Sequence, residues 1–173
     1  MVSIPFCFRV VPQDMIFPDK NFQKSCTFAE VVAAFTVTSI MYWWYPVCLV
    51  LTGAFLRRIF SVANLVRCLH DFVQGMFLMN CSDSQKTFTL QCQPEKLITN
   101  GFFKYMRNPN YLGELIIYAS FTMLVGSLWA WIPNILLCVM FHFKMVDKDR
   151  SMSRYPEFEA WKSSTYMVLP PVL

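Results

Sequence analysis

The segment YMRNPNYLGE, residues 105–114, places polar side chains directly before a long apolar run. Asn108 and Pro109 form a predicted turn into a helix, and the first N–H groups of a helix have no partner inside it. These N–H groups and the positive end of the helix dipole favour a bound phosphate or carboxylate. Arg107 stands beside them. The segment therefore predicts an anion-binding turn at the start of a helix.

Glu114 follows in the first turns of the same predicted helix. An ionised carboxylate in a membrane span is costly unless it is paired or reaches water. The helix dipole alone accounts for many acids at helix starts. Asn110 lies four residues earlier on the same helical face, which favours a polar pocket lined by both side chains. Gly113 between them allows a ligand or a neighbouring backbone to approach closely.

The composition indicates that this helix crosses a membrane. The 173 residues are 55% hydrophobic and 15% charged, whereas soluble domains average about 25% charged residues. The net charge is +4 and forms no basic stripe, so nucleic acid is excluded as an expected partner. We expect membrane lipids as partners instead.

Apolar segments predict an all-α membrane bundle of three to five transmembrane or interfacial helices, followed by a polar helical tail. A span needs ~20 residues, so residues 28–56 are long for one helix and short for two. Pro46 would kink one helix or begin the second arm of a hairpin, and the aromatic cluster Tyr42–Pro46 slightly favours the hairpin. The remaining apolar segments are 59–80, which carries a polar stripe, 111–129 and 131–143.

The chain reads as an N-terminal extramembrane arm, residues 1–27, and one membrane domain, residues 28–173. The arm holds three prolines and no basic start, so it does not resemble a signal peptide. Residues 81–104 are expected to form an extramembrane loop. The polar stretches 82–110 and 144–170 should share one face, and their cations predict that this face is cytosolic or its organellar equivalent.

Neither the cysteines nor the histidines predict a cross-linked or metal-binding fold. Seven cysteines occur without a CxxC pair, which is typical of reduced structural thiols rather than a disulfide framework. His70 and His142 have no partner at metal-ligand spacing. No metal site is expected.

Three ordered blocks of the chain resemble the C-terminal domain of the steroid 5-alpha-reductase family, in particular its uncharacterised eukaryotic branch. They are SDSQK from Ser82, LITNGFFKYMRNPNYLGELIIYASF from Leu97 and KDRSMSRYPEFEAWKSSTYMVLP from Lys148, and the resemblance covers about residues 70–171. It implies a helical membrane domain that binds NADPH on its cytosolic side. Its members reduce a C=C bond conjugated to a carbonyl in a lipid or steroid-like substrate.

The resemblance also implies which residues contact the cofactor. The NYxGE block supplies an asparagine and a glutamate, the SD block supplies an aspartate, and basic residues near these blocks are expected to contact phosphates. The expected cofactor-binding residues are Asp83, Lys104, Arg107, Asn110, Tyr111, Glu114, Arg154 and Tyr155. No catalytic residue is assigned. Glu30, Tyr42 and Tyr45 are positional candidates for a proton donor, without a motif.

Two other functions remain open. The same block is similar to RHPxYxG in isoprenylcysteine carboxyl and phospholipid methyltransferases, which use S-adenosylmethionine and carry a pair of acids in the last helix. Here Asn108 replaces the histidine, and Lys148-Asp149-Arg150 stands where the acids are expected; both differences favour the reductase. The short chain also fits a supernumerary subunit, without a cofactor, of a larger membrane complex. The expected location is the endoplasmic reticulum or the mitochondrial inner membrane.

Overall fold

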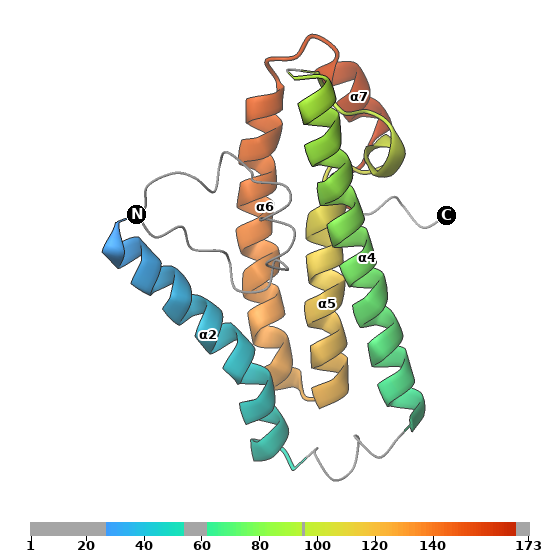
Figure 1. The fold of residues 1–173 in the computed structure, drawn as a ribbon. Coiled ribbons are helices and arrows are strands. Elements are labelled where there is room, and N and C mark those ends of the chain that lie inside the picture. The colour runs from blue at the N-terminus through green and yellow to red at the C-terminus, as the bar shows by residue number, and fades with distance from the viewer. Residues whose placement is uncertain (1–26, 54–61, 95, 169–173) are drawn as a thin grey trace.

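The computed structural model describes residues 27–53, 62–94 and 96–168, which form an all-α bundle (Figure 1). The expected fold class is confirmed. The helices are α2 (Phe28–Leu51), α4 (Val62–Cys92), α5 (Pro109–Val125), α6 (Ile132–Met152) and α7 (Phe158–Ser164), with 3-10 helices η2 (Gly101–Lys104) and η3 (Leu128–Trp131). Within these ranges β-pairing is limited to an isolated parallel bridge between Met106 and Tyr166. The predicted arm up to residue 26 lies outside the described residues.

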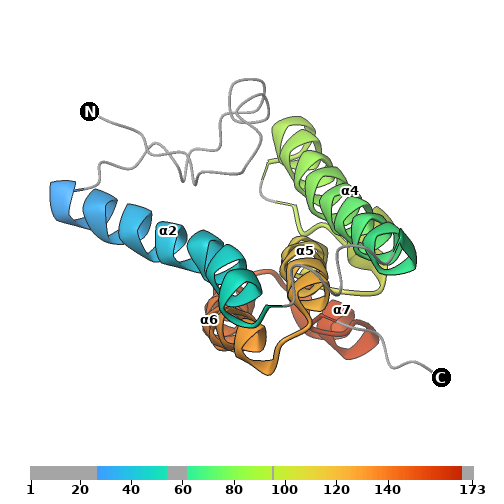
Figure 2. The ribbon, with the colours of Figure 1, turned by 90° about the horizontal axis from the view of Figure 1, so that it is seen from below.

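Helix α5 occupies the middle of the bundle, as the view from below shows (Figure 2). The chain ascends through α4, descends through α5 and ascends again through α6 in the orientation of Figure 1. Gly126 adopts a left-handed φ of 64° and ends α5, which lets the chain turn into η3. Because of this alternation, the end of α4, the segment before α5, the end of α6 and α7 all lie at the upper end. The described parts of the two polar stretches thus lie at the same end of the bundle, as predicted, and the side of the membrane that this end faces stays a prediction.

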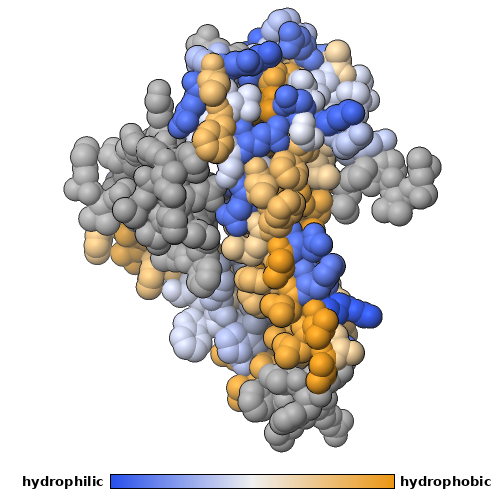
Figure 3. Space-filling view, turned by 45° about the vertical axis from the view of Figure 1, so that its right-hand side comes forward, coloured by the Kyte–Doolittle hydropathy of each residue, from blue (hydrophilic) through white to orange (hydrophobic). Residues whose placement is uncertain are grey.

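The lower part of the molecule has the surface of a membrane protein. Segments Val31–Leu51 and Leu128–Met152 are long and apolar enough to cross a bilayer. Large apolar side chains on both segments are exposed, among them Phe35, Trp43, Ile135 and Phe143. A space-filling view shows apolar residues gathered in the lower part and polar ones at the upper end (Figure 3). Contiguous apolar surface of this kind needs a membrane or a partner to cover it.

Two boundaries differ from the sequence prediction. The predicted loop 81–104 is wrong for its first half, because α4 continues to Cys92, and the predicted return arm 131–143 is extended by α6 to Met152. Neither glycine nor proline occurs between Gly75 and Pro94, so nothing in the backbone ends α4 earlier. In both helices, the change from apolar to polar residues marks where the helix leaves the apolar lower part of the molecule. It does not mark the end of the helix.

The favoured hairpin in residues 28–56 is also wrong, since α2 is one helix that contains Pro46. Packing against neighbouring helices allows a proline inside a membrane helix. Trp44 Nε1 donates to the Trp129 carbonyl at 2.8 Å, and the Tyr45 hydroxyl donates to Asn134 Oδ1 at 2.8 Å. These bonds fix the aromatic cluster of α2 against the turn between α5 and α6.

Helices α4 and α5 approach each other backbone to backbone at two glycines. A Cβ atom on Gly75 would lie 2.7 Å from the Gly113 carbonyl oxygen, and a Cβ on Gly113 would lie 2.7 Å from the Gly75 carbonyl oxygen and from the Met79 nitrogen. Small residues permit such contact between membrane helices. The predicted close approach at Gly113 is therefore to a neighbouring backbone.

A leucine at either glycine should separate α4 from α5. Because the obstructing atoms belong to backbone, Gly75→Leu is expected to destabilise the chain by at least the 1–3 kcal/mol typical of overpacked cores. Gln74→Leu is the matched control, since position 74 is exposed on the same helix. Thermal unfolding in detergent micelles measures both. Equal unfolding midpoints for the two variants would contradict the close approach.

Candidate functional site

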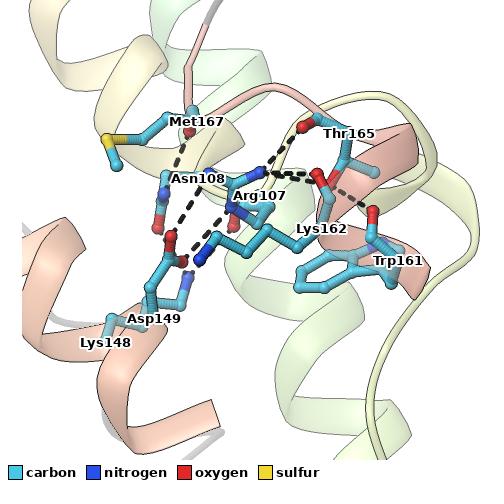
Figure 4. A network of polar contacts seen from close by, with 8 residues as sticks. All are labelled: Arg107, Asn108, Lys148, Asp149, Trp161, Lys162, Thr165 and Met167. Atoms are coloured by element: carbon cyan, nitrogen blue, oxygen red, sulfur yellow. Dashed lines mark hydrogen bonds and ion pairs between the residues drawn. The ribbon is translucent and has the colours of Figure 1, made fainter. Parts of the chain in front are cut away.

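A buried ion pair joins the segment before α5 to the end of α6 (Figure 4). Arg107 Nε donates to Asp149 Oδ1 at 3.3 Å, and Arg107 Nη2 lies 3.2 Å from Asp149 Oδ2. Both side chains are almost fully buried, with 7% and 10% exposure. The two-pronged geometry is the strongest that arginine and a carboxylate form. The anion beside Arg107 is thus supplied by the chain itself.

The same arginine binds the last turn of α7 and the segment that follows it. Arg107 Nη1 donates to the Thr165 carbonyl at 2.7 Å and to the Lys162 carbonyl at 3.3 Å. The Arg107 backbone N–H donates to the Tyr166 carbonyl, and the Tyr166 N–H donates to the Tyr105 carbonyl. The C-terminal segment is therefore anchored across the entrance to α5.

Asn108 and Lys148 form a second link between the same two elements. Lys148 Nζ donates to Asn108 Oδ1 at 2.9 Å and to the Arg107 carbonyl at 3.2 Å, while Asn108 Nδ2 donates to the Met167 carbonyl at 3.0 Å. Asn108 is fully buried, and its side chain makes no capping bond to α5. The charge of Lys148 is also within reach of the Asp83 carboxylate on α4. Lys148 therefore connects α4, α5 and α6 electrostatically.

The first turn of α5 holds a buried side-chain acceptor that has no hydrogen-bond partner among the described residues. The Oδ1 atom of Asn110 is fully buried and accepts no hydrogen bond from the described residues. Glu114 follows on the same face, partly buried and close enough to the Tyr118 hydroxyl for an electrostatic interaction. A buried acceptor left without a donor costs about 1–3 kcal/mol. Asn110 is thus a place where a ligand that donates a hydrogen bond would gain free energy.

The remaining predicted residues lie around this end of the bundle. Tyr111 stacks on Phe141 of α6 with ring centroids 4.8 Å apart. Lys104 and Arg154 are exposed, and each lies over an adjacent tyrosine ring, Tyr105 and Tyr155, at 5.1 Å. The Tyr155 ring packs on the cluster of Leu97, Phe103, Phe158 and Trp161. The cofactor-binding roles of all eight residues stay predictions.

Asn108, Lys148 and Asp149 belong to this polar network, but the sequence analysis did not include them among the expected cofactor-binding residues. A signal for Asp149 exists in the spacing: it continues the buried stripe of Leu137, Phe141 and Met145 at intervals of four. A carboxylate on a buried helix face needs a partner. Asn108 and Lys148 carry no comparable signal, because their bond joins residues 40 positions apart.

Comparison with known families relates this part of the chain to one family. A sequence profile of the phospholipid methyltransferase family matches residues 68–150, which is just under half of the chain. The match runs from the first turns of α4 through α5 to the end of α6 and contains Asn110, Lys148 and Asp149. No curated protein and no solved structure matches the chain. With two apolar helices long enough to span a bilayer, the chain is an integral membrane protein.

Loss of the buried Arg107–Asp149 pair should destabilise the chain more than loss of the exposed Asp147–Arg150 pair. Asp149→Asn leaves the buried Arg107 cation without its counter-charge, which costs about 3–5 kcal/mol when a partner of a buried pair is lost. Asp147→Asn is the matched control on the same helix, because Asp147 is 76% exposed and its partner Arg150, at 4.0 Å, is 81% exposed. Its loss should change stability by less than about 1 kcal/mol. Thermal unfolding of both variants compares them, and similar losses would contradict a structural role for the Arg107–Asp149 pair.

Proposed function

We propose that the chain is an S-adenosylmethionine-dependent methyltransferase that acts on the polar end of a lipid or prenylcysteine. The observation that carries the proposal is the family match over residues 68–150. This segment forms three packed helices whose upper end holds the polar residues described above. The NADPH-dependent reductase function, implied by the resemblance to steroid 5-alpha-reductases, has no comparable support from the family comparison.

The chemistry of the polar groups agrees with this choice of cofactor. The buried Oδ1 atom of Asn110 has no donor among the described residues. The Glu114 carboxylate lies one turn further along α5, and the Asp83 carboxylate lies within electrostatic reach of Lys148. S-adenosylmethionine carries an ammonium, a sulfonium and several hydroxyl and amino donors. NADPH carries three phosphate groups, which need cations, whereas the buried Arg107 is bound to Asp149 and to two carbonyls. The donor-rich cofactor is the better complement.

Some of these polar residues would contact the cofactor, and the others would position them. Asn110 and Glu114 accept hydrogen bonds from the cofactor, and Lys148 offers its positive charge to a carboxylate. Arg107, Asn108 and Asp149 position these groups by holding α5, α6 and the C-terminal segment together. When bound, S-adenosylmethionine supplies an electrophilic methyl group on sulfur. The substrate reaches this end of the bundle from the adjoining leaflet, with its polar group at the membrane surface.

A non-catalytic subunit of a larger membrane complex is the second candidate. It is favoured by the internal bonding of Arg107, Asn108 and Asp149, because all three then have a purely structural explanation. The proposed membrane is that of the endoplasmic reticulum or the inner mitochondrial membrane. The cations at the upper end favour a cytosolic or matrix orientation of that face.

Cofactor binding separates the three functions. Purified chain in detergent should gain thermal stability with S-adenosylmethionine, by about 2.7 kcal/mol at a concentration of one hundred times Kd. NADPH should produce no comparable gain. Asn110→Ala should weaken binding of S-adenosylmethionine about tenfold, since it removes the buried acceptor.

The control is Asn100→Ala, which truncates an exposed asparagine in the segment before η2 and should bind like the unchanged chain. Stabilisation by NADPH alone would favour the reductase. No stabilisation by either cofactor would contradict the methyltransferase proposal and favour the subunit.

A further inference from the structure

A second polar feature lies at the opposite end of the bundle. A half-open cleft of about 350 Å³ is lined by the first turns of α4, the last turns of α5 and the turn into η3. Its polar lining includes Asn64, Arg67 and Ser127, and its apolar lining includes Met123, Leu128 and Trp131. The volume is within the range of about 300–1,000 Å³ typical of ligand sites.

This cleft is separate from the candidate cofactor site. The two lie at opposite ends of α5, whose 17 residues correspond to a length of about 25 Å. Asn110 is at the start of that helix, and Met123 and Gly126 are at its end. The proposed methyltransferase chemistry therefore leaves the cleft without an explanation.

Arg67 is the cation of the cleft, and it differs sharply from Arg107. Its side chain is exposed, and it makes no ion pair or hydrogen bond with the part of the chain that the structure describes. The acid one turn further, Asp71, contacts His70 at 3.2 Å. Around Arg67, α4 exposes Leu65, Val66 and Leu69. A polar patch interrupts the apolar lower part of the molecule over this helix (Figure 3).

At this position, the Arg67 side chain needs an anionic partner. A charged side chain within an apolar belt is costly unless it reaches the head-group layer or a counter-charge. Trp129 and Trp131 of η3 mark this end as the membrane interface, where tryptophan is enriched. Guanidinium binds phosphate oxygens in a two-pronged geometry, and Asn64 and Ser127 add hydrogen-bond donors from two sides.

We propose that this cleft binds the phosphate group of a glycerophospholipid from the leaflet opposite to the candidate cofactor site. Arg67 pairs with the phosphate, Asn64 and Ser127 donate to its oxygens, and the apolar wall of Met123, Leu128 and Trp131 holds the beginning of an acyl chain. A soluble phosphate would use the polar side of the cleft but would leave this wall uncovered. The bound lipid ties α4 to the turn between α5 and α6.

The test titrates the full chain, washed free of lipid in detergent, with phosphatidylglycerol carrying brominated acyl chains, which quench nearby tryptophans such as Trp131. Brominated diacylglycerol, which lacks the phosphate, measures non-specific contact, and inorganic phosphate is added as a competitor. We expect phosphatidylglycerol to quench at about tenfold lower concentration than diacylglycerol. Arg67→Gln should abolish this difference, and Arg67→Lys should retain part of it.

Arg150→Gln is the matched control, because Arg150 is 81% exposed at the other end of the bundle, and it should retain the full preference. Circular dichroism checks that each variant is folded, and the comparison of the two lipids on the unchanged chain does not depend on any variant. Equal quenching by both lipids would overturn the proposal. Complete competition by millimolar inorganic phosphate would overturn the lipid assignment and leave a soluble-anion site.

Discussion

The buried contact between Arg107 and Asp149 organises the polar end of this membrane protein. It joins residues 42 positions apart, and the same guanidinium binds the carbonyls of Lys162 and Thr165. Removing two charges from water is costly unless hydrogen bonds compensate for it, and each side-chain nitrogen of Arg107 and each carboxylate oxygen of Asp149 has a partner in this network. Helix α5, helix α6 and the C-terminal segment consequently have one mutual arrangement, and Asn110 and Glu114 have fixed surroundings.

Two different kinds of contact set the rest of the bundle. Gly75 and Gly113 bring the backbones of α4 and α5 together, which places Asp83 of α4 within electrostatic reach of Lys148 on α6. At the other end, Asn134 Nδ2 donates to Thr122 Oγ1 at 2.7 Å and accepts from Tyr45. Hydrogen bonds between side chains thus connect α2, α5 and α6 in the interior of the bundle.

Local patterns in the sequence predicted the helical class, the polar face and the entry into α5. They failed at Pro46 and at residues 81–92, because polarity and a single proline were interpreted as the ends of helices. The sequence predicted the part of the site that α5 and the segment before it supply, but not the part that α6 supplies. The chain's own carboxylate next to Arg107 depends on a contact between distant residues, which spacing alone does not reveal, although the position of Asp149 on a buried stripe gives an indication. The family match further shifts the expected cofactor from NADPH to S-adenosylmethionine.

The most direct measurement is photolabelling of the full chain in membranes with a photoreactive S-adenosylmethionine analogue, followed by mass mapping of the labelled peptides. A site organised by the Arg107–Asp149 pair around Asn110 predicts label in residues 105–114 and 144–155, reduced by S-adenosylmethionine and not by NADPH. Label confined to the far end of the bundle, or label that only NADPH displaces, would contradict this site.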